Sequence, residues 1–146
     1  MFRRIVVAYD GSKGATEALR KAVELTKLCE AELMVLTVYR HHSMLEASIS
    51  MVRPEATAGT LDDAMREHAE EVVEQGKTVA VRLGAAGTRA FVKNGPVARG
   101  IVAFAEEHDA DLVVLGSRGL GSMDRYLLGS VSHKVSGLAD VPVLVV

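Results

Sequence analysis

Two groups of small residues in the C-terminal third of the sequence have the types and spacing needed to bind an anion. Gly116-Ser117-Arg118-Gly119 follows the apolar run Leu112–Leu115, and Gly129-Ser130 comes after nine further residues. Glycine permits a sharp turn with φ > 0, and without a Cβ its amide can approach an anion closely. The segment from Gly129 is expected to begin a helix, whose first N–H groups lack intrahelical partners and favour negative charge. Together the two groups predict a phosphate-binding site.

Side chains in the same segments can add to this site. The hydroxyls of Ser130 and Ser132 can donate hydrogen bonds to phosphate oxygens, and the guanidinium of Arg118 matches phosphate geometry. A Walker motif is excluded because Ser122-Met123 stands where that motif needs lysine, and the dinucleotide glycine pattern fails at Asp124. The structural alternative is that the glycines only end a strand and begin a helix.

The rest of the chain alternates between two hydrophobic patterns. Continuous apolar runs are typical of buried parallel strands, and apolar residues recurring every three or four positions are typical of helices. The runs predict strands at Ile5–Tyr9, Leu33–Val38, Ala90–Val92, Leu112–Leu115 and Val141–Val146, with helices at Gly14–Glu30, Thr60–Leu83, Val97–Ala105 and Gly129–Leu138. This order predicts one α/β domain spanning residues 1–146, with a parallel sheet and helices on both faces.

The predicted helix ends and one long connection add local detail. Thr60 is expected to cap the second helix, and Pro96 to occupy the first position of the third. The irregular stretch Arg40–Gly59 contains a capping box at Ser43–Glu46, which predicts a short helix that is either a lid or a cover for the sheet. The adjacent pair His41-His42 lacks the spacing of metal ligands, so no metal site is expected.

Composition limits the compartment and the partners. The 146 residues are enough for one domain, and 49% hydrophobic with 25% charged residues is typical of a soluble globular protein. A net charge of −2 and only 4% aromatic residues argue against nucleic acid as a partner. The sequence has no run of about 18 apolar residues, so no membrane-spanning helix is predicted. With Cys29 as the single cysteine, an internal disulfide is excluded, and the cytoplasm is the expected location.

The glycine spacing resembles the ATP-binding signature G-2x-G-9x-G-[ST] of the universal stress protein family. The opening strand that leads to Asp10 and the terminal strand Val141–Val146 are also similar to that family, so the resemblance covers the whole chain. It implies a doubly wound, Rossmann-like sheet of five parallel strands in the order 3-2-1-4-5. Ligands of such sheets bind beyond the carboxyl ends of the strands, where the order reverses, so Asp10 and Gly116 would flank one crevice.

The resemblance further implies which residues would bind ATP. Asp10 would lie near the ribose, the backbone of Ala8 and Val38 near the adenine, and Leu115 at the floor of the crevice. The phosphates would be surrounded by Gly116, Arg118, Gly119, Gly129, Ser130, Val131 and Ser132, with Mg²⁺ held through phosphate oxygens. Many members have proline where this chain has Ala8, which leaves the adenine pocket less rigid. From the residues alone, Asp10 would be a turn-forming aspartate before Gly11.

The function implied by the resemblance is that of an ATP-binding regulatory protein of the stress response, with no catalytic residues assigned. Two alternatives stay open. One is a weak ATP hydrolase or nucleotide-transfer enzyme that uses the same pocket and needs a base near Asp10. The other is a dimeric scaffold that binds no nucleotide, which the intact glycines argue against.

Two protein partners are also expected. The stretch His41–Glu55 resembles family members encoded beside tripartite ATP-independent periplasmic (TRAP-type) transporters, which implies a membrane transporter as a partner. The terminal strand Val141–Val146 is flat, apolar and uncharged, and at a sheet edge it would expose unpaired backbone groups. A homodimer through this strand would pair them, and the family commonly dimerises in this way. Leu144→Pro is expected to remove a donor at the centre of that interface.

Overall fold

A computed structural model describes residues 1–40, 58–117 and 128–146 of the chain. The elements in order are β1 (Arg4–Ala8), α1 (Lys13–Cys29), β2 (Glu32–Tyr39), α3 (Ala58–Arg82), β3 (Arg89–Asn94), α4 (Val97–Glu107), β4 (Leu112–Leu115), α5 (Ser130–Leu138) and β5 (Val143–Val145). The strands pair in parallel in the order β3-β2-β1-β4-β5. The predicted fold class and strand order are therefore confirmed.

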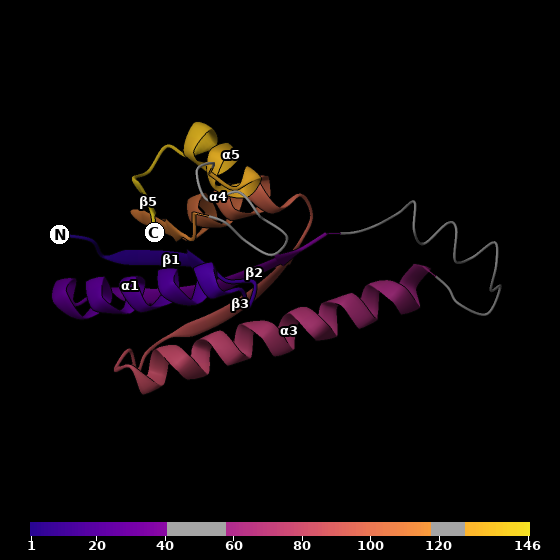
Figure 1. Cartoon of the computed structure of the whole chain (residues 1–146), viewed down its shortest axis with the longest axis horizontal. Helices are drawn as coiled ribbons and strands as arrows, with labels where there is room; N and C mark the ends of the chain where they lie inside the picture. Colours follow the sequence, from indigo (N-terminus) through magenta and orange to yellow (C-terminus); the bar gives the residue numbers. More distant parts are fainter. Residues whose placement is uncertain (41–57, 118–127) are drawn as a thin grey trace.

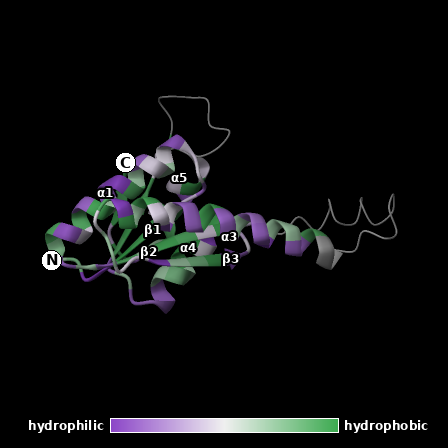
Figure 2. Ribbon diagram, turned by 90° about the horizontal axis from the view of Figure 1, so that it is seen from below, coloured by the Kyte–Doolittle hydropathy of each residue, from purple (hydrophilic) through white to green (hydrophobic). Residues whose placement is uncertain are grey.

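Helices cover both faces of the sheet, α1 and α3 on one face and α4 and α5 on the other (Figure 1). Successive side chains of a strand point to opposite faces, so Ile5 and Val7 enter the core under α1 and α3, whereas Val6 enters the core under α4 and α5. Figure 2 shows the strands as mainly hydrophobic and the helices as mixed, and the edge strand β3 has polar residues at both ends. Burial on both faces explains why the strands are continuous apolar runs in the sequence.

Three predicted helix ends differ from the observed ones. Thr60 is not a cap, because α3 extends further toward the N-terminus and begins at Ala58. Leu83 follows α3 and is 38% exposed, so it does not belong to the buried face. Pro96 is the N-cap of α4 and not its first helical residue, since its ψ of 129° is extended and its carbonyl accepts a hydrogen bond from the amide of Gly100 at 2.8 Å.

The terminal strand lies at the sheet edge as predicted but is shorter, because Pro142 has no N–H to donate to the ladder. The carbonyl of Pro142 accepts from Val113, and the amide of Val146 donates to Leu115, so both residues face β4. Backbone groups alternate sides along a strand, so Leu144 also faces β4, and the open edge is formed by the residues between them, Val143 and Val145. The prediction that Leu144→Pro removes a donor from a dimer interface is therefore wrong.

Gly116, directly after β4, packs against the backbone at the start of α1. A Cβ at Gly116 would lie 2.8 Å from both the carbonyl carbon and the carbonyl oxygen of Gly14, closer than real Cβ contacts. The expected φ > 0 is not found at Gly116, because the described glycines with positive φ are Gly11, Gly84 and Gly95. Glycine at position 116 is required by the close approach of two backbone segments.

This contact predicts that Gly116→Ala lowers the free energy of unfolding by about 1–3 kcal/mol, because the Cβ must push the end of β4 away from α1. The matched control is Gly137→Ala in α5, where an added Cβ meets no atom within 4 Å. Because alanine favours a helix more than glycine does, the control should gain up to about 1 kcal/mol. Urea unfolding of both variants measures the difference. Equal stability of the two would contradict the packing argument.

Candidate functional site

The candidate site lies where the carboxyl ends of β1 and β4 meet. These strands are neighbours in the middle of the sheet, with Val7 opposite Val114, and they end one residue further on at Ala8 and Leu115. β1 leads into α1 on one face, and the helix that follows β4, α5, lies on the other face. In open parallel sheets this reversal leaves a crevice in which ligands bind.

Four of the predicted site residues lie around one apolar cluster on the α4 and α5 side of the sheet. Leu115 belongs to this cluster and is only 2% exposed, and Ala8, Val38 and Val131 are half-buried against it. They come from β1, β2, β4 and α5. The fold therefore places two residues expected near the adenine, Ala8 and Val38, against the same cluster as Leu115, expected at the floor of the crevice, and Val131, expected near the phosphates.

Asp10 is part of the turn that joins β1 to α1. Its Oδ1 accepts a hydrogen bond of 2.9 Å from the amide of Ser12, and Gly11 between them has φ of +84°. The Oγ of Ser12 in turn accepts from the amide of Ala15 at 3.1 Å and so caps α1. The turn-forming role that the residues alone predicted for Asp10 is confirmed, and this turn fixes the carboxylate beside the end of β1.

The start of α5 presents free backbone donors. Its N-cap, Gly129, makes no side-chain capping hydrogen bond, and the amide of His133 donates to the Gly129 carbonyl at 3.0 Å. The amides of Ser130, Val131 and Ser132 therefore precede the first intrahelical bond. Gly129 has φ of −60°, so the expected φ > 0 is wrong here as well. Its own amide donates to the carbonyl of Ser117 at 2.6 Å.

Ser132 ties α5 to the end of β4. Its side chain is buried, with the residue 3% exposed, and its Oγ donates a hydrogen bond of 2.5 Å to the carbonyl of Gly116. A serine hydroxyl has one proton, so the prediction that this hydroxyl donates to a phosphate is wrong. Any contribution of Ser132 to anion binding comes from its backbone amide. The amide of Ser117 is also used, since it donates to the carbonyl of Val146 at 2.8 Å.

Some predicted features fall outside the described residues. Among them are Arg118, Gly119, the helix predicted from Ser43, the His41-His42 pair and the transporter-like stretch 41–55. In residues 1–40, 58–117 and 128–146 no three acidic, histidine or cysteine side chains are grouped as metal ligands. No helix in the same residues is both long and apolar enough to cross a membrane.

Tyr39 ends β2, one residue beyond Val38. Burial raises the pKa of its phenol above the ordinary value, and the negative charge of Asp62 raises it further. The phenol therefore stays neutral at physiological pH. This part of the site carries no negative charge from Tyr39 that would repel an anion.

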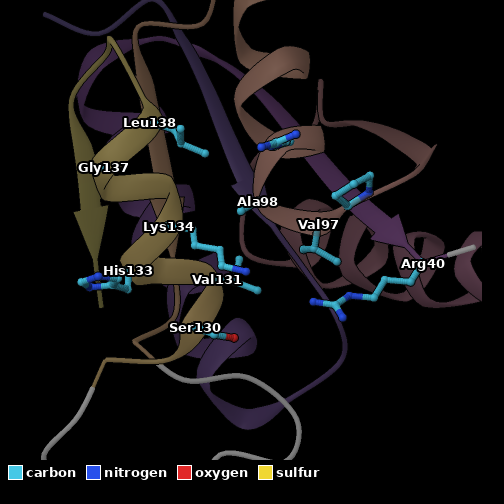
Figure 3. A pocket seen from close by; sticks show the side chains of 11 residues that line it. Arg40, Val97, Ala98, Ser130, Val131, His133, Lys134, Gly137 and Leu138 are labelled. Carbon is cyan, nitrogen blue, oxygen red and sulfur yellow. The ribbon is translucent and has the colours of Figure 1, made fainter.

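A cavity of about 450 Å³ lies between α4 and α5 beside the candidate site (Figure 3). Residues that line it include Arg40, Val97, Ala98, Arg99, Ser130, Val131, Lys134 and Leu138. Its cations, Arg40, Arg99 and Lys134, were not predicted from the sequence. The sequence does carry one signal, because Ser130, Lys134 and Leu138 recur every four residues on one helix face.

This fold and site define a doubly wound α/β protein with a ligand crevice at the reversal of its strand order. The chain belongs to the universal stress protein family, whose model matches residues 1–146, so the resemblance found in the sequence is confirmed. Universal stress protein YxiE of Bacillus subtilis is 35% identical over 148 residues, covering 100% of this chain and 99% of the relative.

Two solved structures extend the comparison. Universal stress protein UspA from Lactobacillus plantarum is similar with a TM-score of 0.82 and 26% identity, over 99% of this chain and 97% of that one. A universal stress protein crystallised in complex with cAMP is similar with a TM-score of 0.72 and 26% identity, over the same shares of the two chains. A protein of this fold and family thus binds an adenine nucleotide.

The hydrogen bond from Ser132 to Gly116 predicts that Ser132→Ala lowers the free energy of unfolding by about 1 kcal/mol, because the half-buried carbonyl of Gly116 loses its donor. Ser136→Ala is the matched control, since Ser136 is an exposed serine of the same helix whose hydroxyl donates only to the helical carbonyl of Ser132. The control should change stability by less than about 0.5 kcal/mol. Chemical denaturation followed by circular dichroism makes the comparison, and a loss of the same size in both variants would refute the special role of Ser132.

Proposed function

We propose that the chain binds ATP with Mg²⁺ in the crevice at the carboxyl ends of β1 and β4, and that the bound nucleotide regulates its contacts with other proteins in a stress response. The observation that carries the proposal is the uncapped start of α5, which the bond from Ser132 to Gly116 fastens to the end of β4. The cAMP complex of a relative supports an adenine nucleotide as the ligand class.

The two ends of the crevice suit the two ends of such a ligand. Ala8, Val38 and Leu115 offer apolar contact for a base, and the carboxylate of Asp10, in the turn after β1, would accept a hydrogen bond from a ribose hydroxyl. The amides at the start of α5 suit phosphate oxygens, because the positive end of the helix dipole favours negative charge. Arg118 and Gly119, which complete the glycine signature, are expected to close around the same phosphates.

Mg²⁺ fits this arrangement as a partner of the phosphates. The described residues hold no cluster of carboxylates to coordinate the ion, so its ligands would be phosphate oxygens and water. The ion would reduce the repulsion between the phosphate groups. The protein's part is to orient the nucleotide through the α5 amides and Asp10.

Any nucleotide that co-purifies with the protein identifies the ligand directly. The protein is purified without added nucleotide and denatured, and the extract is separated by ion-pair chromatography against ATP, ADP, AMP and cAMP standards. ATP is the expected component, and calorimetric titration of the nucleotide-free protein should show tighter binding with Mg²⁺ than without it. An extract free of nucleotide, together with no heat of binding for ATP at millimolar concentration, would refute the proposal.

A side chain at Gly129 should obstruct the phosphates. Gly129→Val is expected to weaken ATP binding at least about tenfold, because the isopropyl group would stand before the uncapped amides and cost a charge-assisted hydrogen bond. Its φ of −60° accommodates valine, so folding should persist. Gly137→Val, at the other end of α5, is the control and should keep the affinity. ATP binding that survives β-branched residues at both Gly119 and Gly129 would contradict the phosphate site.

The proposal includes a homodimer through the terminal segment Val141–Val146. β5 pairs with β4 on one side only, so the backbone groups of Val143 and Val145 face outward. A second copy presenting the same strand antiparallel would pair these groups about a two-fold axis. The segment is apolar and uncharged, which favours burial between two copies.

Val145→Pro tests this interface, because it removes an outward-facing donor and leaves the bonds to β4 in place. Sedimentation velocity should show a dimer for the original chain and a monomer for this variant. Val145→Thr keeps the amide and a β-branched side chain, so it should remain dimeric. The dimer through β5 is excluded if the original chain sediments as a monomer at a protein concentration on the order of 10⁻⁵ M. It is also excluded if the Val145→Pro variant is folded and stays dimeric.

A membrane transporter as a regulated partner stays a prediction. It depends on the stretch 41–55, which lies outside the described residues. Unchanged solute uptake in a strain deleted for this protein would contradict it.

A further inference from the structure

The cavity between α4 and α5 concentrates positive charge on a chain whose net charge is −2. Arg40, Arg99 and Lys134 line it, and among the residues that the structure describes its lining contains no aspartate or glutamate. Within the described part of the chain these three cations form no ion pair or hydrogen bond. They come from the end of β2, from α4 and from α5, so the positive charge is a product of the fold.

The same cavity has an apolar part. Val97 and Val131 are half-buried in its wall, and Leu138 is a large apolar side chain left 49% exposed. Figure 3 shows the side chains of Lys134 and Leu138 extending from α5 toward α4, with Arg40 reaching toward them from the opposite side. The ring of His133 extends on the other side of α5. The cavity thus combines cationic groups with an apolar surface.

Three positive side chains around one space repel each other, and an anion between them removes that repulsion. α4 begins at this cavity, so the positive end of its dipole adds to the positive potential. α5 lines the cavity from its first residue to its last, so the two ends of its dipole oppose each other there. Guanidinium groups bind phosphate through two parallel hydrogen bonds. A volume of about 450 Å³ lies within the usual range for small-molecule sites.

We propose that this cavity is a second binding site, for a small organic molecule that carries a phosphate group on an apolar body. The phosphate lies among Arg40, Arg99 and Lys134, and the apolar body packs on Val131 and Leu138. The positive charge of the lining repels cations. A fully polar ligand is disfavoured because it would leave the apolar wall exposed to water.

This site is distinct from the proposed nucleotide site and goes beyond it. Ala8, Asp10 and Leu115 do not line the cavity, which extends along α5 from Ser130 to Leu138, about 12 Å at the helical rise per residue. The two sites share only Ser130 and Val131. A ligand that packs on Val131 and Leu138 leaves Ala8, Asp10 and Leu115 uncovered, and it would border the nucleotide at the first turn of α5.

Phenyl phosphate is a suitable probe, because it joins a phosphate to an apolar ring. Titration into ¹⁵N-labelled protein should shift the amide resonances of Ala98, Val131, Lys134 and Leu138 with one saturable dissociation constant. Higher salt should weaken the binding, because the ions screen the exposed cations. Phenol, which lacks the charge, and inorganic phosphate, which lacks the ring, should each bind more weakly than phenyl phosphate.

Charge reversal locates the probe. The double variant Arg99→Glu with Lys134→Glu should raise the dissociation constant for phenyl phosphate at least about tenfold, through the loss of charge-assisted hydrogen bonds. The matched control is Arg20→Glu with Arg82→Glu, two exposed cations of α1 and α3 on the other side of the sheet, which changes the net charge equally. The control should bind the probe unchanged. Because all four side chains are exposed, both variants should fold, as circular dichroism can verify.

Three outcomes would overturn the proposal. The first is the absence of any shift in the cavity amides at millimolar probe. The second is equal binding of inorganic phosphate and phenyl phosphate, which would indicate an adventitious ion only. The third is displacement of the probe by ATP together with unchanged affinity in the charge-reversed variant, which would place the probe in the nucleotide site. Probe binding that persists at saturating ATP supports a second site, and a failure to bind ATP leaves the test of this site unaffected.

Discussion

The structure depends on the parallel pairing of β1 with β4 in the middle of the sheet. Both strands are buried on both faces, with Val6, Val7, Val113 and Val114 fully inaccessible to solvent. Parallel pairing forces their carboxyl ends to the same edge, and the helices that follow must cover opposite faces. The start of α1 and the start of α5 therefore meet beside one crevice, and the positions of the described site residues follow from this arrangement.

Small residues and short hydrogen bonds fasten these two helix starts to the end of β4. Gly116 touches the backbone of α1, and its carbonyl accepts the proton of Ser132 from α5. Ser117 joins both Gly129 and Val146 through backbone bonds. The start of α5 is thus joined to the end of β4 although it has no side-chain cap, an omission that costs a helix only about 0.3 kcal/mol when the N-cap is glycine. Rigid, uncapped amides are the feature that an anion-binding helix start requires.

The two helices on the second face also line the cavity between them, and they supply two of its three described cations, Arg99 and Lys134. Their first turns lie side by side there, so a nucleotide at the end of β4 and a phosphate compound in the cavity would bind to adjacent parts of α5. Such adjacency gives a physical route for coupling, because each anion changes the electrostatic potential felt by the other.

The sequence by itself determined the strands, the helices, the fold class and the glycine signature. A strand buried on both faces is a continuous apolar run, whereas a helix buried on one face has apolar residues every three or four positions, so the two are distinguishable in the sequence. It also determined the turn at Asp10, which depends on neighbouring residues alone. Only the tertiary structure decided that Gly116 must be glycine and that the hydroxyl of Ser132 already donates to a carbonyl. It also decided that the backbone of Leu144 faces β4, and that Arg40, Arg99 and Lys134 line one cavity. Each of these depends on contacts between segments distant in the chain, and residue patterns do not encode such contacts.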